Sequence, residues 1–474
     1  MIRRAVGRVI GFLRSTGFAI ALLAFTGVWS MVATFVPQGD AYEPGVMAWA
    51  AAHPVAEKIT GFLGLHQAFT APVFRVAVVA LALSTGLCAW RRTSVARARA
   101  RSLRRAAMAS AEDLIADHDL EIPCSRALSR SEAETRGAEA LLRLGLRTKF
   151  DHGVLASVSP WWAVLGSPVF HWGLVALIVV VLAGGLVRSE GLMGIAVGET
   201  KRDAPESYRV LEAGPLHSWK RIDRSIRVDG FETDYQTGSI DRGPVPTVSV
   251  LDGKGQVITT QRVYPNNPLQ VGSLTIHPAE FGFAAILTLL DKNGADLGSQ
   301  TELIDISQET SSGTVPVEPL TLNDAGRQLV VAVTVPMERS GEGLAAPQER
   351  VAHVEVFTTD DVLVTDAMMA VGDELMLPSG SKLRLRDLTF YSRLNVVDDP
   401  SVPLLYAALA VALAGLAVVV FVRQQIVLGA YVEDGDRGTF LMRLRLWKNV
   451  PTNRAEIESE LTKALNGQAD EEDR

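Results

Sequence analysis

One titratable residue lies inside a long apolar stretch: His171, within residues 162–182. An imidazole is costly to place in a membrane-spanning helix, so it usually faces a partner helix, a proton path or a cofactor. The residues on its helical face, such as Val164 and Ile178, are mostly apolar. An apolar wall around one imidazole suits haem, whose iron accepts a histidine nitrogen. Position alone leaves three interpretations open: a neutral histidine hydrogen-bonded to a neighbouring helix, a haem ligand, or a proton relay.

Other residues capable of chemistry form no comparable site. The sequence shows no nucleophile with a base, no phosphate-binding loop and no paired carboxylates, which argues against a hydrolase. Cys88 and Cys124 have no CxxC, CxxCH or zinc-ligand spacing, so covalent haem attachment by the usual motif is excluded and a thioredoxin-type redox role is disfavoured. Five further histidines lack a ligand-spaced neighbour, and the sequence assigns them no role: His53, His66, His217, His277 and His353.

Four apolar segments are long enough to cross a bilayer, which takes about 20 residues of helix. They are residues 16–36, 72–90, 161–187 and 401–422. In the first, Thr26, Ser30 and Thr34 fall on one stripe, and in the third Gly166 and Gly173 lie on another face than His171. Small and hydroxyl side chains allow helices to approach closely, so we expect each of these places to contact another span or a partner protein.

Charge asymmetry predicts the topology of these spans. Arg3, Arg4, Arg8 and Arg14 precede the first span, and residues 91–105 after the second are strongly basic. The positive-inside rule then places both termini in the cytoplasm and residues 188–400 outside the cytoplasmic membrane. Because the basic run directly follows an apolar helix, we interpret it as an orientation determinant and not as a nucleic-acid site. A cleaved signal peptide is a weaker interpretation of the first span, because no small-residue cleavage motif stands out.

Between the spans, the local patterns predict several distinct segments. Residues 37–71 predict an external loop with an amphipathic helix near the membrane surface. Residues 91–160 and 423–474 predict a cytoplasmic segment and a cytoplasmic tail, with a helix capped at Ser129 or Ser131, a hairpin over 147–158, a strand over 437–446 and a helix over 453–466. Residues 339–347 read as an exposed loop, and 468–474 as an acidic end.

Residues 188–400 alternate apolar and polar side chains over many short runs, for example 225–231, 247–251 and 328–335. Turn dipeptides such as Asp252-Gly253 and Asn293-Gly294 separate these runs. The pattern predicts an all-β domain, a sandwich or barrel, inserted between spans three and four. Since both cysteines lie elsewhere, this domain must fold without disulfides.

Several separated segments of the chain resemble one family, the ResB (or CcsB) proteins of the System II cytochrome c biogenesis route. The resemblance rests on residues 13–38 around the first span, 83–92 at the end of the second, the Phe170-His171 motif of the third, the turn over 266–272, and 399–405 before the fourth. Ala33 stands where glycine is usual in the family, and Trp172 is bulkier than the residue common there. The segments occur in the family's order over nearly the full length.

The resemblance implies a function. Proteins of this family pair with a multi-span CcsA/ResC-like protein, move haem outward and present it to apocytochrome c. Carried over, His171 would be one axial ligand of the iron of haem b, held transiently and shared with the partner. A thioredoxin-like thiol reductant and the lipid bilayer are the other implied partners. The resemblance implies a subunit of a haem–cytochrome c synthetase, and not an enzyme by itself. The alternative is a membrane-anchored scaffold or sensor whose β domain binds a protein without haem.

Overall fold

The computed structural model describes residues 11–39, 44–124, 128–310, 313–316, 320–335, 350–434 and 437–467. Arg3, Arg4 and Arg8, the expected loop over 339–347 and the acidic end over 468–474 lie outside these residues. The chain divides into two compact units, Met1–Val181 with Leu404–Arg474, and Leu182–Pro403. Each unit is described by itself.

Four described helices are long and apolar enough to cross a membrane, and a β-rich region lies between the third and fourth, as the sequence predicts. The helices are α2 (Thr16–Ala33), α5 (Pro72–Ala106), α8 (Gly166–Val187, preceded by the 3-10 turn η2, Trp161–Leu165) and α9 (Val402–Phe421). Two ends differ from the expected spans. Helix α2 ends at Ala33, and α5 continues through the basic run to Ala106, because Ala96, Leu103 and Ala106 are buried in an apolar cluster beyond the span.

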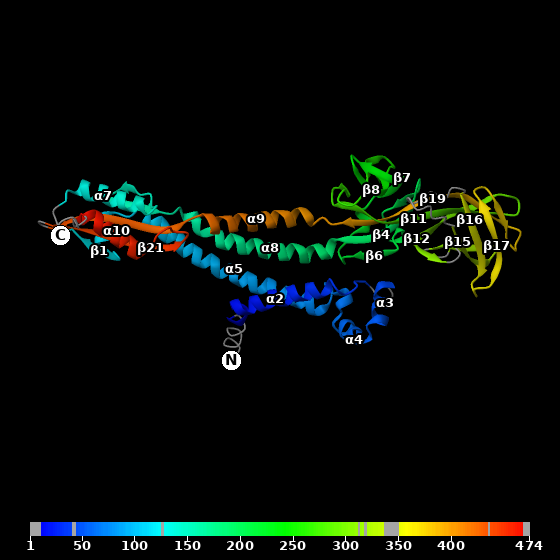
Figure 1. The fold of residues 1–474 in the computed structure, drawn as a ribbon, viewed down its shortest axis with the longest axis horizontal. Helices are drawn as coiled ribbons and strands as arrows, with labels where there is room; N and C mark the ends of the chain where they lie inside the picture. Colours follow the sequence, from blue (N-terminus) through cyan, green and yellow to red (C-terminus); the bar gives the residue numbers. More distant parts are fainter. Residues whose placement is uncertain are drawn as a thin grey trace. The chain divides into compact units, whose positions relative to one another are not determined.

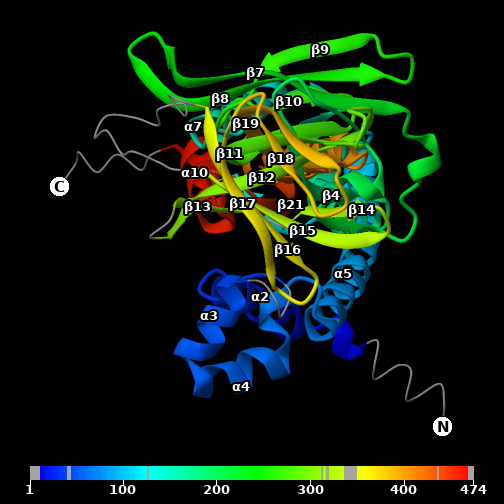
Figure 2. The same ribbon diagram turned by 90° about the vertical axis from the view of Figure 1, so that its right-hand side faces the viewer.

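The segment between α2 and α5 contains two helices where we expected one. Helix α3 (Pro44–Ala52) stops before Pro54, and α4 (Pro54–Leu63) starts at it, followed by the 3-10 turn η1 (Leu65–Gln67). Proline has no N–H to continue a helix and disfavours helical backbone in the preceding residue; His53 accordingly has φ −130° and ψ 59°. Figure 2 shows α3 and α4 beside α2 and α5.

The segments after the second and fourth spans fold together into one α/β domain (Figure 1). Its five-stranded antiparallel sheet has the order β1-β21-β20-β3-β2. One face packs on α7 and α10, and the other on the extension of α5 and on α6. The elements are α6 (Ala111–Ala116), β1 (Leu120–Pro123), α7 (Arg130–Arg143), β2 (Lys149–Asp151), β3 (Val154–Val158), β20 (Gln424–Asp434), β21 (Arg437–Lys448) and α10 (Arg454–Asn466).

Local predictions in this domain are confirmed. The Ser129 side chain accepts the Glu132 N–H and caps α7, and Asn453 forms a capping box with Glu456 at the start of α10. Gly145 follows α7 with φ 74°, the left-handed conformation expected for a residue just past a helix end. The predicted hairpin is β2–β3, and the predicted strand over 437–446 is β21.

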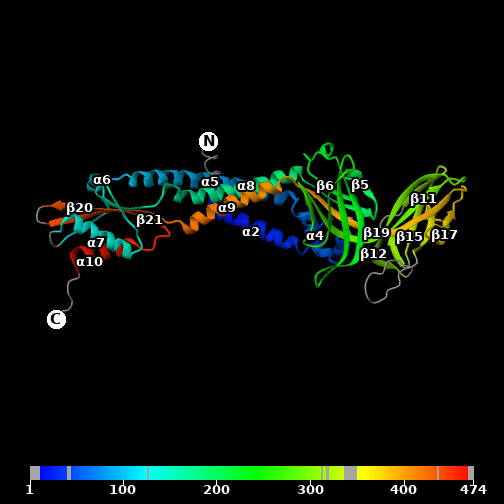
Figure 3. The ribbon, with the colours of Figure 1, turned by 90° about the horizontal axis from the view of Figure 1, so that it is seen from above.

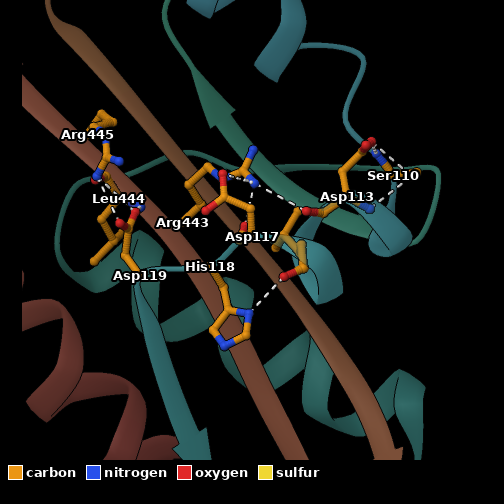
Figure 4. A network of polar contacts seen from close by, with 9 residues as sticks. Ser110, Asp113, Asp117, His118, Asp119, Arg443, Leu444 and Arg445 are labelled. Carbon is orange, nitrogen blue, oxygen red and sulfur yellow. Dashed lines mark hydrogen bonds and ion pairs between the residues drawn. The ribbon is translucent and has the colours of Figure 1, made fainter.

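Arginines of β21 tie this sheet to the chain between α6 and β1 (Figure 4). Arg443 pairs with Asp117 at 2.9 Å, and Arg445 with Asp119 at 2.9 Å. Burial raises the pKa of Asp119, but the hydrogen bonds from the Leu444 N–H and from Arg445 outweigh it, so the pKa lies below its ordinary value. The Asp119 carboxylate is therefore charged at neutral pH and holds β1 against β21.

The unit between spans three and four contains three sheets of described strands. An eight-stranded sheet has β13-β12-β11-β19-β4-β6 as its main path, with β10 and β18 paired at its side; the others are β14-β15-β16-β17 and β5-β7-β8-β9. The elements are β4 (Ser189–Ala196), β5 (Thr200–Arg202), η3 (Pro205–Ser207), β6 (Val210–Ala213), η4 (Trp219–Arg221), β7 (Arg224–Thr237), β8 (Ile240–Asp252), β9 (Val257–Arg262), β10 (Leu269–Val271), β11 (Leu274–Leu290), β12 (Asp296–Thr310), β13 (Gly313–Pro316), β14 (Leu320–Asp324), β15 (Arg327–Thr334), β16 (Val351–Thr358), β17 (Leu363–Ala370), β18 (Glu374–Met376) and β19 (Lys382–Asp398).

Two apolar cores share the long strands β11 and β19. Figure 3 labels these two strands. The first part of β11, including Ile276, packs with β4, β7 and β8. The second part, including Phe283 and Leu287, packs with β14 to β17. The pairing of β11 with β19 shifts register between Pro278 and Glu280, where the strands pass from one core to the next. The predicted β-rich domain between spans three and four is thus confirmed, and it is built around two apolar cores.

A buried ionic network joins the ends of β5, β7 and β19. Arg224 donates from Nε to Asp203 at 2.7 Å and from Nη2 to Asp398 at 2.7 Å, and the Tyr208 hydroxyl donates to Asp203. Burial and the neighbouring Asp203 carboxylate raise the pKa of Tyr208, so its hydroxyl stays a donor. The side chain of Asp203 is only 2 % exposed, so it depends on Arg224 for its charge balance.

We expect Arg224→Met to destabilise this unit by about 3 kcal/mol or more, because it leaves the carboxylates of Asp203 and Asp398, which are little exposed, without their positive partner. Hydrogen exchange of β5 and β7 in the full chain measures the effect. The control is Arg227→Met on the same strand, which breaks a more exposed pair with Asp229 and should cost less than about 1 kcal/mol. Equal losses of protection in the two variants would contradict a special role for the Arg224 network.

Candidate functional site

The glycine face of α8 fixes where His171 lies. A Cβ atom at Gly173 would lie 2.7 Å from the Ala412 Cα of α9, and one at Gly415 would lie 2.3 Å from the Phe170 N. A Cβ atom at Gly166 would lie 2.9 Å from the Gly415 carbonyl oxygen. Figures 1 and 3 show the two helices side by side. The expected close contact at Gly166 and Gly173 is confirmed, and its partner is α9.

Helix α8 also contacts α5. The Trp172 Nε1 donates to the Thr93 Oγ1 at 3.0 Å. Just before α8, the Trp161 ring lies 4.3 Å below the Arg104 guanidinium of α5, a cation–π contact. Helix α8 is thus held by α5 on one side and, through its glycines, by α9 on another. These contacts fix the rotation of α8 about its axis and with it the direction in which His171 points.

The His171 ring presents one free nitrogen. Its Nδ1 lies 2.7 Å from the Ser167 carbonyl oxygen, one turn earlier in α8. A carbonyl only accepts, so Nδ1 carries the proton and donates, and in a neutral ring Nε2 keeps its lone pair. Within the described residues, Nε2 has no hydrogen-bond partner. A backbone carbonyl that fixes the tautomer in this way is the arrangement found behind metal-ligating histidines.

His171 is directed away from α9. At 100° per residue, Gly173 and Gly166 lie about 160° and about 140° from it around the helix axis. Val175 and Ile178 share the face of His171, and both are partly exposed. The imidazole therefore lies on an apolar face of α8 that the fourth span does not cover.

The other candidate histidines contact nearby groups of the fold, with the exception of His277. His66 contacts the Pro37 carbonyl and Glu57, both at 2.8 Å, and His217 contacts the Val187 carbonyl at 2.8 Å. His353 lies 3.1 Å from Asp366, and His53 stacks on Trp49 at 4.1 Å between ring centres. His277 is exposed, and no contact of its ring is recorded in the described part of β11. No group of three His, Cys, Asp or Glu side chains placed to hold a metal ion occurs in the described ranges.

Among the residues that the structure describes, the hydroxyl stripe of the first span makes no hydrogen bond to another helix. The Thr26 Oγ1 donates to the Leu22 carbonyl and the Thr34 Oγ1 to the Met31 carbonyl, both within α2. Other residues make hydrogen bonds near the ends of these helices. Ser84 Oγ of α5 donates to the carbonyl of Leu13, which precedes α2, at 2.7 Å, and Trp29 Nε1 of α2 donates to the carbonyl of Ala68, which precedes α5, at 2.9 Å.

The partner face on α9 was not predicted. Ala408, Ala412 and Gly415 are its buried residues. Their spacing of four and three residues is that of one helical face, so the pattern is readable in the sequence. Small residues are frequent throughout that span, so the pattern by itself does not single out this face.

The His171 site fits one axial position of a haem iron. Its Nε2 is a neutral nitrogen donor and the surrounding face is apolar, as the macrocycle requires. The site offers one imidazole nitrogen, which is enough for one axial position. The arrangement can bind and orient a metal macrocycle through this nitrogen.

Fold and site together define a class: a membrane protein with four spans, a large β-rich domain between the third and fourth, and a single imidazole of ligand type in the third. The sequence profile of the ResB-like family matches residues 17–439, and the chain belongs to this family. It is 25% identical over 470 residues to the cytochrome c biogenesis protein CcsB of Thermosynechococcus vestitus, covering 95% of this chain and 93% of that protein.

Two other relatives cover a similar share. The CcsB protein of a Picosynechococcus species is 23% identical over 94% of this chain and 89% of its own length. That of Microcystis aeruginosa is 22% identical over 93% and 90%, respectively. The family assignment suggested by the five sequence segments is thereby confirmed.

Proposed function

We propose that this chain acts in cytochrome c biogenesis, as the membrane subunit that handles and exports haem with a CcsA/ResC-like partner for attachment to apocytochrome c. The observation that carries the proposal is the His171 ring, whose Nδ1 is held by the Ser167 carbonyl and whose Nε2 is free on an apolar face. Full-length similarity to proteins named for cytochrome c biogenesis supports it.

In this proposal the α/β domain that contains the arginine-rich end of α5 is cytoplasmic, and the β domain lies outside the cytoplasmic membrane. The uncovered face of α8 then receives the partner, which brings the second axial ligand. Haem supplies the iron and the vinyl groups that become linked to cytochrome c. The residues of this chain bind and orient: His171 at the iron, Ser167 at the ring's other nitrogen. Reductant and thiols come from other proteins, including a thioredoxin-like one.

The test uses the chain co-expressed and co-purified with its partner. We expect His171→Ala to lower haem per complex by about tenfold or more, since loss of a mere supporting contact already costs about 10-fold to 100-fold in metal affinity. Cytochrome c maturation should fall with it. His171→Gly should regain its haem spectrum when imidazole is added, because the small ligand fills the space left by the side chain.

His277→Ala, at an exposed histidine of the β domain, is the matched control and should keep wild-type haem content. If His171→Ala kept both its haem and its maturation activity, the ligand role would be wrong. A complex without haem in the wild type as well would favour the scaffold or sensor.

A further inference from the structure

Helix α4 has its polar side chains on the inside. Thr60 is 7 % exposed and donates to Glu57 at 3.0 Å. The same carboxylate lies 2.8 Å from the Nε2 of His66, which is 8 % exposed and contacts the Pro37 carbonyl through Nδ1. The two ring nitrogens thus lie against the Pro37 carbonyl and the Glu57 carboxylate, which ties α4 to the end of the first span. The hydrogen bond from His66 lowers the pKa of Glu57, as such a pair requires.

The outward face of α4 is apolar. Val55, Ile59 and Phe62 are 77 %, 60 % and 88 % exposed. Their spacing of four and three residues places them on one stripe of the helix. This is the reverse of a helix on a water-soluble domain, which buries its apolar stripe and exposes its polar one. An outward stripe of this kind needs a nonaqueous neighbour.

The position of α4 in the chain indicates what that neighbour is. Trp29, Ala33 and Val36 at the end of α2 form one apolar cluster with Leu65, Ala68 and Ala71 before α5. The Gln38 amide donates to the Leu65 carbonyl at 2.9 Å and closes the connection. Helix α4 is thus held at the end of two membrane spans. The span ends themselves expose Phe35 (74 %) and Phe69 (53 %), so apolar exposure runs from the spans into this segment.

We propose that α4 lies in the interfacial layer of the bilayer, with Val55, Ile59 and Phe62 inserted at the boundary of headgroups and acyl chains. The adjoining lipid-facing ends of α2 and α5 favour lipid over a protein as the occupant. Lys58, exposed and next to the stripe, is placed to reach the headgroup phosphates while its stem stays at the apolar boundary. The Glu57–His66 pair holds the helix in the orientation that turns its apolar side to the lipid.

The test is a fluorescence measurement on the full chain in nanodiscs of phosphatidylethanolamine and phosphatidylglycerol. In a background with Cys88→Ser and Cys124→Ala, Phe62→Cys or Val55→Cys carries an environment-sensitive nitrobenzoxadiazole label. We expect blue-shifted emission, and quenching by lipids with a doxyl group high on the acyl chain. Lys254→Cys, in the exposed β8–β9 turn, is the control and should emit as in water. Circular dichroism and size-exclusion chromatography confirm that each labelled chain is folded.

Emission at both stripe positions as in water would overturn the proposal. The proposal would also be wrong if doxyl lipids did not quench the labels but the partner protein shielded them from water. The stripe would then be a protein-binding surface. A third check changes the orientation of α4. Glu57→Gln weakens the contact with His66 and should reduce the quenching of the label at Phe62→Cys. Lys58→Gln should leave the Glu57–His66 contact unchanged and alter the depth of the label in the bilayer only slightly.

Discussion

Replacing Gly415 with leucine is expected to separate α9 from α8 and, on the role proposed for His171, to abolish haem retention although the histidine is unchanged. A side chain at Gly415 would meet the Phe170 backbone N at 2.3 Å and its Cα at 2.8 Å, next to the histidine. Backbone atoms cannot turn aside as a flexible side chain can, so the two helices must move apart. Forcing extra volume into a tightly packed contact costs up to about 3 kcal/mol of stability. Here the cost also includes the lost packing between α8 and α9.

The measurement is haem per purified complex together with the thermal unfolding midpoint of the solubilised chain. Gly185→Leu is the matched control: Gly185 is in the same helix as His171, and a Cβ there meets nothing within 4 Å. It should behave as wild type in both measurements. Wild-type haem content in Gly415→Leu would show that the α8–α9 contact does not position the site.

The second large effect concerns Glu302 in the β domain, a carboxyl that is 1 % exposed. Its Oε1 accepts the Val333 N–H at 3.2 Å, and its Oε2 is buried without a partner among the described residues. Burial raises the pKa of Glu302 from 4.5 to about 8. The folded chain therefore binds one more proton than the unfolded chain between these two values.

This difference makes the stability of the domain depend on pH. The contribution of protonated Glu302 is fully present below its unfolded pKa of 4.5 and is lost as pH rises through about 8. The slope approaches about 1.4 kcal/mol per pH unit within that window, because one proton is released on unfolding. Glu302→Gln resembles the protonated form in shape and hydrogen bonding, so we expect it to remove most of this slope.

Hydrogen exchange of β12 and β15, expressed as protection factors between about pH 5 and about pH 8, measures the effect. Glu212→Gln, at an exposed position of β6, should leave the slope unchanged. A wild-type slope preserved in Glu302→Gln would assign the pH dependence to other groups.

Features set by neighbouring residues were predictable. The four spans follow from runs of apolar residues, and the caps at Ser129 and Asn453 follow from side chains that accept an N–H two or three residues later. The turn at Asn293-Gly294 is present between β11 and β12, with Gly294 at φ 85°, because glycine takes left-handed backbone at little cost. Errors arose where a local rule was applied too broadly, as for the single helix drawn across Pro54.

Long-range associations were not predictable from one sequence. Strand β3 pairs with β20 through Leu155 and Gly429 and through Val158 and Ile426, although the whole β domain and two spans separate them in the chain. Each strand shows its own alternation or apolar run, but alternation does not name a partner. The sequence therefore indicates residues 91–160 and 423–474 only as two separate segments. In the structure, strands from both segments form one sheet.

For the candidate site, the sequence by itself determined that an imidazole lies within the third span, because hydropathy depends on composition along the chain. It also placed two glycines on another face of that helix, because the helical period is fixed. Only the tertiary structure decided that this glycine face meets α9 and that His171 lies on the uncovered side, with its Nδ1 engaged by Ser167. The physical reason is that a rotamer and a helix–helix contact depend on close packing against particular atoms, which no local pattern specifies.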